Sequence, residues 1–162
     1  MKLYFIRHAT ATDIALNDAA RELTEEGRDE AAIAGAALAG LGVDPSAIFT
    51  SPLVRARQTA EIVAKGLKHK NKVQTIEELT NDTSTADLIC FLKRFEKEKE
   101  VALVGHAPSL SIHVAALVGA KNHEGIPLGK GGIACVELDE LLAGKGELRW
   151  LMRQRQLRAI AG

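Results

Sequence analysis

The stretch "LYFIRHATAT", residues 3–12, places four apolar side chains directly before Arg7 and His8. A short apolar run of this kind is typical of a strand that is buried on both faces, as in a parallel sheet. The stretch "VALVGH", residues 101–106, has the same form and ends on His106. Ligands bind at the carboxyl ends of strands in open α/β sheets, so two central parallel strands would bring both imidazoles to one edge.

Apolar runs alternate with helical patterns along the chain, which is typical of an α/β fold. Besides the two strands already named, the pattern predicts strands over "AIFT" and "VQTI" and helices over 25–41, 52–67, 85–97 and 108–118. The segments "GGIACVELDE" and "GELRWLM" predict two further strands joined by a turn. We therefore expect a three-layer α/β/α fold with a mostly parallel central sheet and a C-terminal antiparallel hairpin.

Two of the helices allow more detailed predictions. In the helix over 25–41, one apolar stripe is expected to hold Ile33, Ala37 and Leu41, and Gly42 is expected to end the helix. In the next helix, Ser51 is expected to cap the N-terminus and Pro52 to occupy the first position. Its core-facing stripe is predicted to be Ala56, Ala60, Val63 and Leu67.

Length and charge indicate how many domains the chain forms and which kinds of partner it does not attract. With 162 residues, 46% of them hydrophobic, the chain can bury one core and hardly two, so we expect a single domain over residues 1–162. The 21 basic and 21 acidic residues cancel, so nothing global attracts nucleic acid or an anionic membrane. No apolar run is long enough to span a membrane, and "MKLYFIRH" is too short for a signal peptide, so a cytoplasmic protein is expected.

Positive charge nevertheless gathers locally. The stretch "AIFTSPLVRAR" places Arg55 and Arg57 in the first turns of a helix, where the dipole already favours an anion. Arg57 is better explained as a surface charge, and Arg21 could either reach the same edge or pair with a nearby acid such as Asp18 or Glu22. The convergence of His8, His106 and Arg55 on strand ends predicts a site for a dianion, of which phosphate is the usual one.

Four ordered motifs, "FIRHAT", "RELTEEG", "SPLVRARQTAEI" and "LVGHAPSL", resemble the histidine phosphatase superfamily, also called the phosphoglycerate mutase-like fold. The short length, "RELTEEG" and the C-terminal segments are similar to its SixA-type phosphohistidine phosphatases. The resemblance implies that His8 is the nucleophile and that Arg7, Arg55 and His106 bind the phosphoryl oxygens, with Arg21 at the same pocket. It also implies that no metal or cofactor takes part and that the substrate is a phosphohistidine-bearing phosphotransfer protein.

The leaving group distinguishes the hydrolysis of phosphohistidine from the hydrolysis of a phosphoester. An alkoxide leaves poorly and needs a protonated carboxyl beside it, whereas the imidazole of phosphohistidine leaves readily. Glu77 and Glu78 are the acidic candidates, although solvated charges at a strand end explain them more simply. A small-molecule phosphoester phosphatase or mutase therefore remains an alternative, and a phosphate-binding module without turnover is a weaker one.

Four further features need separate consideration. Ala9 stands where the family usually has Gly, so a positive φ at this position would strain the loop. Thr10 and Thr12 could donate hydroxyls to phosphate, but capping of the loop is the simpler role. The basic segment Lys68–Lys72 could dock a partner or be a solvated turn. Cys90 and Cys135 have neither disulfide nor metal spacing and are expected to be small core residues.

Overall fold

The computed structural model describes residues 1–162 and contains six strands and five α-helices. The strands are β1 (Lys2–Arg7), β2 (Ala47–Thr50), β3 (Gln74–Thr75), β4 (Glu100–Gly105), β5 (Ile133–Leu138) and β6 (Gly146–Met152). The helices are α1 (Glu25–Gly40), α2 (Val54–Gly66), α3 (Thr85–Leu92), α4 (Ser109–Val118) and α5 (Gln154–Ala161). Short 3-10 turns cover Asp18–Ala20, Glu77–Leu79 and Lys93–Phe95.

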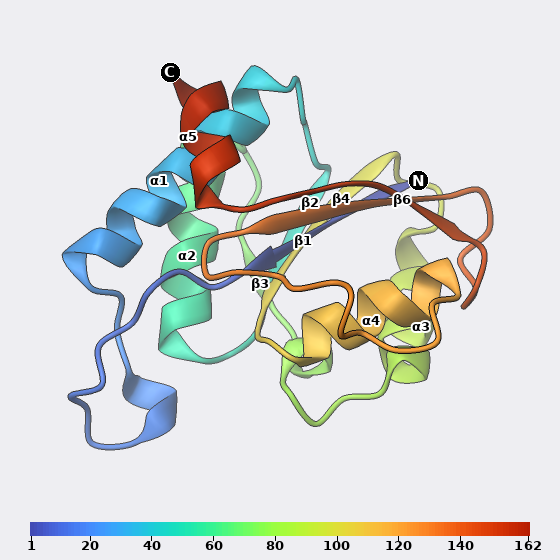
Figure 1. Cartoon of the computed structure of the whole chain (residues 1–162), viewed down its shortest axis with the longest axis horizontal. Coiled ribbons are helices and arrows are strands. Elements are labelled where there is room, and N and C mark those ends of the chain that lie inside the picture. Colours follow the sequence, from blue (N-terminus) through green and yellow to red (C-terminus); the bar gives the residue numbers. More distant parts are fainter.

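All six strands form one sheet in the order β3-β2-β4-β1-β5-β6 (Figure 1). β1 and β4 are central and parallel, with Arg7 opposite Gly105, and β2 is parallel to both β4 and β3. β5 pairs antiparallel with β1 and with β6. The predicted three-layer fold with a mostly parallel sheet and a C-terminal antiparallel hairpin is therefore confirmed.

Each face of the sheet has its own core. On one face, Tyr4, Ile6 and Ile48 pack with α1, α2 and α5, while on the other Leu3, Phe5 and Phe49 pack with α3 and α4. Figure 1 shows the same division, with α1, α2 and α5 on one side of the strands and α3 and α4 on the other. The alternation follows from the pleat, because successive side chains of a strand point to opposite faces.

Several details differ from the sequence predictions. Leu41 lies beyond the end of α1 and is 43% exposed, because the helix packs through Ala34, Ala37 and Leu38. Small residues allow this close packing against α2, and a Cβ added at Gly35 would come within 3.0 Å of the Val63 carbonyl oxygen. The predicted strand "VQTI" shrinks to the two residues of β3, and the helix predicted over 85–97 ends at Leu92.

The start of α2 is also different. Leu53 is the N-cap, no side chain caps the helix, and Ser51 and Pro52 lie before it. The predicted core stripe holds for Ala56, Ala60 and Val63, which are fully buried. Cys90 is exposed, contrary to prediction, whereas Cys135 is buried as expected.

The helix α5 was not predicted. Its sequence, "QRQLRAIA", is largely polar, and only Leu157 is fully buried, in the core that α1 and α2 share. The amide of Gln154 donates to the carbonyl oxygens of Glu30 and Gly131 at 3.0 and 2.8 Å, which fixes the start of α5 against α1. Tertiary contacts thus stabilise a helix that is too short to form alone.

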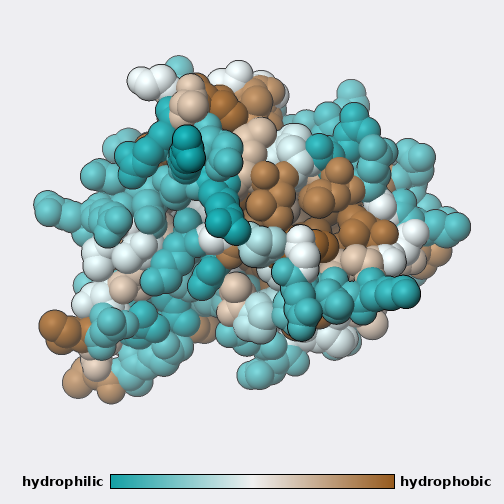
Figure 2. Space-filling view, viewed as in Figure 1, coloured by the Kyte–Doolittle hydropathy of each residue, from teal (hydrophilic) through white to brown (hydrophobic).

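Most of the surface seen in Figure 2 is hydrophilic, with hydrophobic side chains gathered in the middle of that face. None of the helices combines the length and the apolar character that a membrane crossing requires.

Candidate active site

His8 directly follows β1, and its backbone N–H donates to the carbonyl oxygen of Gly105 at the end of β4 (2.9 Å). Its ring nitrogen Nδ1 lies 2.8 Å from the carbonyl oxygen of Ala9. A carbonyl oxygen can only accept, so Nδ1 carries the proton and Nε2 of the neutral ring has a lone pair. This bond fixes the ring and leaves Nε2 as its basic atom.

His106 directly follows β4 at the same edge of the sheet, with its ring centroid 5.1 Å from that of His8. Its Nε2 lies 2.7 Å from the hydroxyl oxygen of Ser51, which follows β2. Its Nδ1 is buried and has no hydrogen-bond partner. The predicted meeting of the two histidines is thus present, because β1 and β4 are neighbouring parallel strands.

Arg55 lies in the first turn of α2 and is only 5% exposed. Its Nε donates to Nε2 of His8 at 3.3 Å, and its Nη1 donates to the carbonyl oxygen of Asp18 at 2.7 Å. Thr59, one helical turn further, donates to the Arg55 carbonyl oxygen and accepts from the Ala9 N–H. The hydroxyl of Thr59 therefore joins the loop that carries His8 to the helix that carries Arg55.

Arg7 is the last residue of β1 and directly precedes His8. Its Nη1 donates to the carbonyl oxygen of Leu128 at 3.0 Å, while its Nε is buried without a partner. Buried polar groups normally have partners, so the unpaired buried nitrogens of Arg7 and His106 at this edge are available to a polar ligand.

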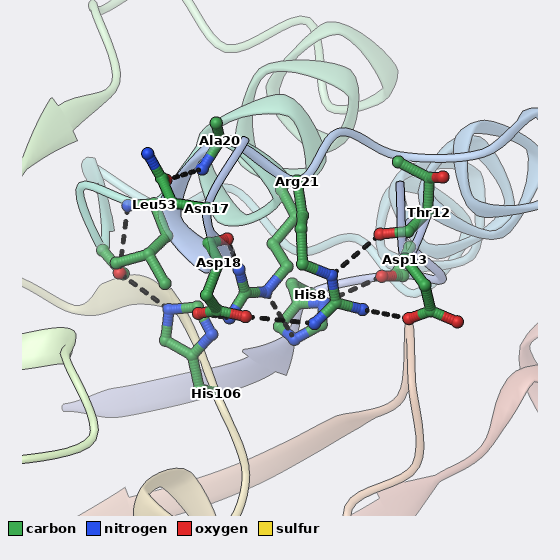
Figure 3. A network of polar contacts seen from close by, with 12 residues as sticks. His8, Thr12, Asp13, Asn17, Asp18, Ala20, Arg21, Leu53 and His106 are labelled. Carbon is green, nitrogen blue, oxygen red and sulfur yellow. Dashed lines mark hydrogen bonds and ion pairs between the residues drawn. The ribbon is translucent and has the colours of Figure 1, made fainter. Parts of the chain in front are cut away.

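Arg21 lies at the same edge, within a network of carboxylates (Figure 3). Its guanidinium contacts Asp13 at 3.0 Å and Asp18 at 3.1 Å, and its Nε donates to the carbonyl oxygen of Thr12. The other carboxylate oxygen of Asp18 contacts Nη2 of Arg55 at 3.1 Å. One carboxylate thus bridges two of the arginines predicted to bind phosphate.

Asp18 is the site residue that sequence reasoning missed, since it was considered only as a pairing partner of Arg21. Figure 3 shows its carboxylate between His106 and the guanidinium of Arg21. Two arginines at one strand-end edge could have signalled a local counter-ion, but nothing in the sequence shows that Arg55 and Arg21 share it.

Burial and positive charge set the protonation states. Burial first, and then the charges of His106, Arg55 and Arg7, lower the pKa of His8 to about 3, against an opposing hydrogen bond to Ala9. Burial, with Arg55 and Arg7, lowers the pKa of His106 to about 4. Both rings are therefore neutral at physiological pH, so His8 presents a lone pair and His106 presents one N–H.

The acidic group at this site is held ionised. Hydrogen bonds from Arg21, and then from Arg55, lower the pKa of Asp18. Glu77 is exposed and Glu78 half-buried, and neither carboxylate makes a hydrogen bond or ion pair. Neither of these two carboxylates therefore hydrogen-bonds to His8 or His106.

The remaining candidates lie outside this cluster. Arg57 is exposed, as expected of a surface charge. Thr10 donates through its N–H and hydroxyl to Glu30, and the hydroxyl of Thr12 accepts from the Ile14 N–H, so both residues order their loop as predicted. Ala9 is buried and does not have a positive φ, so the strain considered for this position is absent.

No three His, Cys, Asp or Glu side chains are arranged to hold a metal ion. The charge at the site comes instead from guanidinium groups, which bind oxyanions in a planar, bidentate manner. The arrangement can bind a tetrahedral dianion and present an unprotonated imidazole nitrogen to it.

Comparisons with known proteins agree with this geometry. The histidine phosphatase superfamily (branch 1) matches residues 3–82. The chain is 32% identical to the phosphohistidine phosphatase SixA homolog of Haemophilus influenzae, covering 75% of this chain and 80% of that one. It is 29% identical to the phosphohistidine phosphatase SixA of Escherichia coli, over 94% of this chain and 93% of that one.

A solved structure of a SixA protein has the same fold as this chain. The protein histidine phosphatase SixA, complexed with tungstate, superposes with a TM-score of 0.88 at 29% identity, over 97% of this chain and 99% of the other. Together with the paired histidines and the arginines around them, these similarities identify the chain as a member of the histidine phosphatase superfamily, a SixA-like hydrolase.

Proposed function

We propose that this protein hydrolyses phosphohistidine on a partner protein through a covalent phosphohistidine intermediate on His8. The observation that carries the proposal is the hydrogen bond from Nδ1 of His8 to the carbonyl oxygen of Ala9, at 2.8 Å. It leaves Nε2 unprotonated among Arg55, Arg7 and His106. A nucleophilic nitrogen beside donors for an oxyanion is the arrangement that phosphoryl transfer requires.

The roles follow from the chemistry of the transition state. Phosphoryl transfer spreads negative charge over the equatorial oxygens, so positioning and electrostatic stabilisation supply most of the catalysis. Arg7 and Arg55 would bind these oxygens through guanidinium N–H groups, and His106 would donate from Nδ1. Arg21, which is more exposed, would complete the binding of the dianion.

The reaction would proceed in two displacements. In the first, the hydrogen bond from Nε of Arg55 to Nε2 of His8 (3.3 Å) is exchanged for one to a phosphoryl oxygen, which frees the lone pair of Nε2. This lone pair attacks phosphorus, an N–P bond forms on His8, and the N–P bond to the substrate imidazole breaks. The leaving imidazole takes up a proton from solvent. Water then attacks the phosphoenzyme, which restores His8 and releases inorganic phosphate, so that one difficult displacement is divided into two easier ones.

The ionised carboxylate of Asp18 supports phosphohistidine over an alkyl phosphoester as the substrate. An alkoxide leaving group would need a general acid. Asp18 bridges Arg21 and Arg55, and because both arginines lower its pKa, its carboxylate carries no proton to donate. Imidazole is a better leaving group and does not require one. The similarity to SixA proteins supports the same substrate class.

An open groove beside the site supports a protein substrate. It has a volume of about 410 Å³ and begins at Arg7, with Pro108, His123 and Arg153 along its walls. Arg7 is the one site residue that lines this groove, so a phosphorylated side chain lying in it would meet the guanidinium of Arg7 while the protein that carries it stays outside.

The experiment is a phosphate-release assay that compares a phosphohistidine-bearing phosphotransfer domain with phosphorylated sugars and glycerates. We expect preferential release from phosphohistidine, loss of turnover in His8→Ala, and an acid-labile phosphoenzyme in the wild type. His69→Ala is the control, because His69 follows the opposite end of α2 from Arg55. Near wild-type activity in His8→Ala would refute the mechanism, and a preference for a small ester would refute the substrate class.

A further inference from the structure

Ser51 was expected to cap a helix, but its hydroxyl belongs to the active site instead. The residue is completely buried, and its backbone N–H donates to the carbonyl oxygen of Val104 at 3.0 Å. This bond fixes the end of β2 against β4, two residues before His106. The hydroxyl oxygen then lies 2.7 Å from Nε2 of His106.

The direction of that hydrogen bond follows from the other partner of the hydroxyl. The Leu53 N–H, which can only donate, lies 3.3 Å from the same oxygen. Ser51 therefore accepts from Leu53, and its single O–H has no acceptor besides Nε2 of His106. If Nε2 carried the proton, the buried hydroxyl hydrogen would have no partner, which costs free energy.

The arrangement also accounts for the other nitrogen of the ring. When Nε2 accepts, the proton of the neutral imidazole resides on Nδ1, the buried atom without a partner. This atom would then be a donor toward the site shared with His8. In the opposite tautomer a lone pair would face the phosphoryl oxygens and repel them.

We propose that Ser51 is a positioning residue whose hydroxyl holds the proton of His106 on Nδ1, so that the ring donates a hydrogen bond to a phosphoryl oxygen. The inference rests on the proposed function, in which His106 binds the phosphoryl group. The hydroxyl of Ser51 contacts the His106 ring and the Leu53 N–H, so it acts through His106.

The chain offers a matched control for this role. Ser109 is also buried, and its hydroxyl donates to the backbone carbonyl oxygen of His106 at 3.0 Å. Ser51→Ala and Ser109→Ala thus each remove one buried hydroxyl that contacts His106. Only the first removes a contact to the ring, while Ser51→Thr retains a hydroxyl at the same position.

The first measurement is the tautomer of His106, read from the ¹⁵N shifts of its ring in the wild-type protein. We expect the Nδ1–H form in the wild type and in Ser109→Ala, and a shift toward the Nε2–H form in Ser51→Ala. An Nε2–H ring in the wild type would overturn the proposal without any variant.

The second measurement is the dissociation constant of inorganic phosphate. In Ser51→Ala the proton of His106 can move to Nε2, and the ring then no longer donates from Nδ1 to the charged phosphoryl group. We therefore expect binding about tenfold weaker or more. Ser109→Ala should stay within about threefold of the wild type, and Ser51→Thr should recover most of the loss. Unchanged phosphate binding in Ser51→Ala, with the ring still Nδ1–H, would refute the role of Ser51.

Neither readout needs a phosphohistidine substrate, so the two proposals can fail separately. A protein that prefers small esters but shows the expected tautomer and phosphate binding would refute the substrate class and retain the role of Ser51.

Discussion

Replacing Asp18 with Asn should strengthen the binding of phosphate, because the Asp18 carboxylate pairs with the two guanidinium groups that we propose bind the phosphate. It contacts Nη1 of Arg21 and Nη2 of Arg55, both at 3.1 Å. Asn has nearly the same shape but no charge. The backbone carbonyl oxygen of residue 18 would still accept from Nη1 of Arg55, so the loop should stay in place.

The size of the effect follows from exposure. The side chain of Asp18 is 65% exposed, whereas those of Arg55 and Arg21 are 6% and 26% exposed. Exposed ion pairs contribute about 0.2 to 1 kcal/mol, and the pair with buried Arg55 should be near the upper limit. A total of about 1 to 1.4 kcal/mol corresponds to phosphate binding about five- to tenfold tighter.

Calorimetric titration with inorganic phosphate at pH 7 measures this difference. Asp13→Asn is the matched control, because Asp13 is 97% exposed and pairs only with Arg21, so its effect should stay below about twofold. Phosphate binding in Asp18→Asn that is equal to or weaker than in the wild type would refute the reasoning. Asp18 would then hold the arginines in position rather than compete for them.

Three further predictions concern catalysis and stability. Arg55→Ala should lower kcat by about a hundredfold or more, the range for losing one preorganised donor; a loss below about fivefold in steady-state assays would contradict its role. Activity should survive a chelator, and activity that is lost with EDTA and restored by added metal would contradict a site based on arginines. Burial lowers the pKa values of His8, His106 and His113 to about 3, 4 and 4. Between pH 6.5 and about 4 the unfolded chain therefore binds more protons than the folded one. The contribution of these rings to the free energy of unfolding is complete above pH 6.5. As the pH falls below 6.5, this contribution should decrease by up to about 1.4 kcal/mol per pH unit for each ring. Urea unfolding of wild type and His113→Asn at several pH values tests this, and an unchanged slope in the variant would contradict it.

The fold and the central pair of the site were predictable from local patterns. The runs "LYFI" and "VALV" are apolar enough to be buried strands. The first is followed by Arg7 and His8, and the second by Gly105 and His106. In an α/β fold the carboxyl ends of parallel strands share one edge. The positions of His8 and His106 at one edge therefore followed from the sequence once β1 and β4 were expected to be central and parallel, and the structure shows that the two strands are neighbours.

Other features depended on contacts between distant segments. The helix α5 lacks a strong helical pattern and is fixed by Gln154, whose partners lie at Glu30 and Gly131. The absence of strain at Ala9 could not be predicted either, because its backbone conformation depends on how the loop meets α2 through Thr59.

The sequence by itself determined which residue types stand at the strand ends, because hydrophobic patterning acts over short stretches. The order of the strands, which places β1 beside the distant β4, belongs to the tertiary structure. Only the tertiary structure decided that Asp18 bridges Arg21 and Arg55 and that Ser51 bonds to His106. The partners in these contacts are separated by 3, 37 and 55 residues. A sequence pattern identifies a donor or an acceptor, but the direction of a hydrogen bond depends on which other groups the folded chain brings within reach.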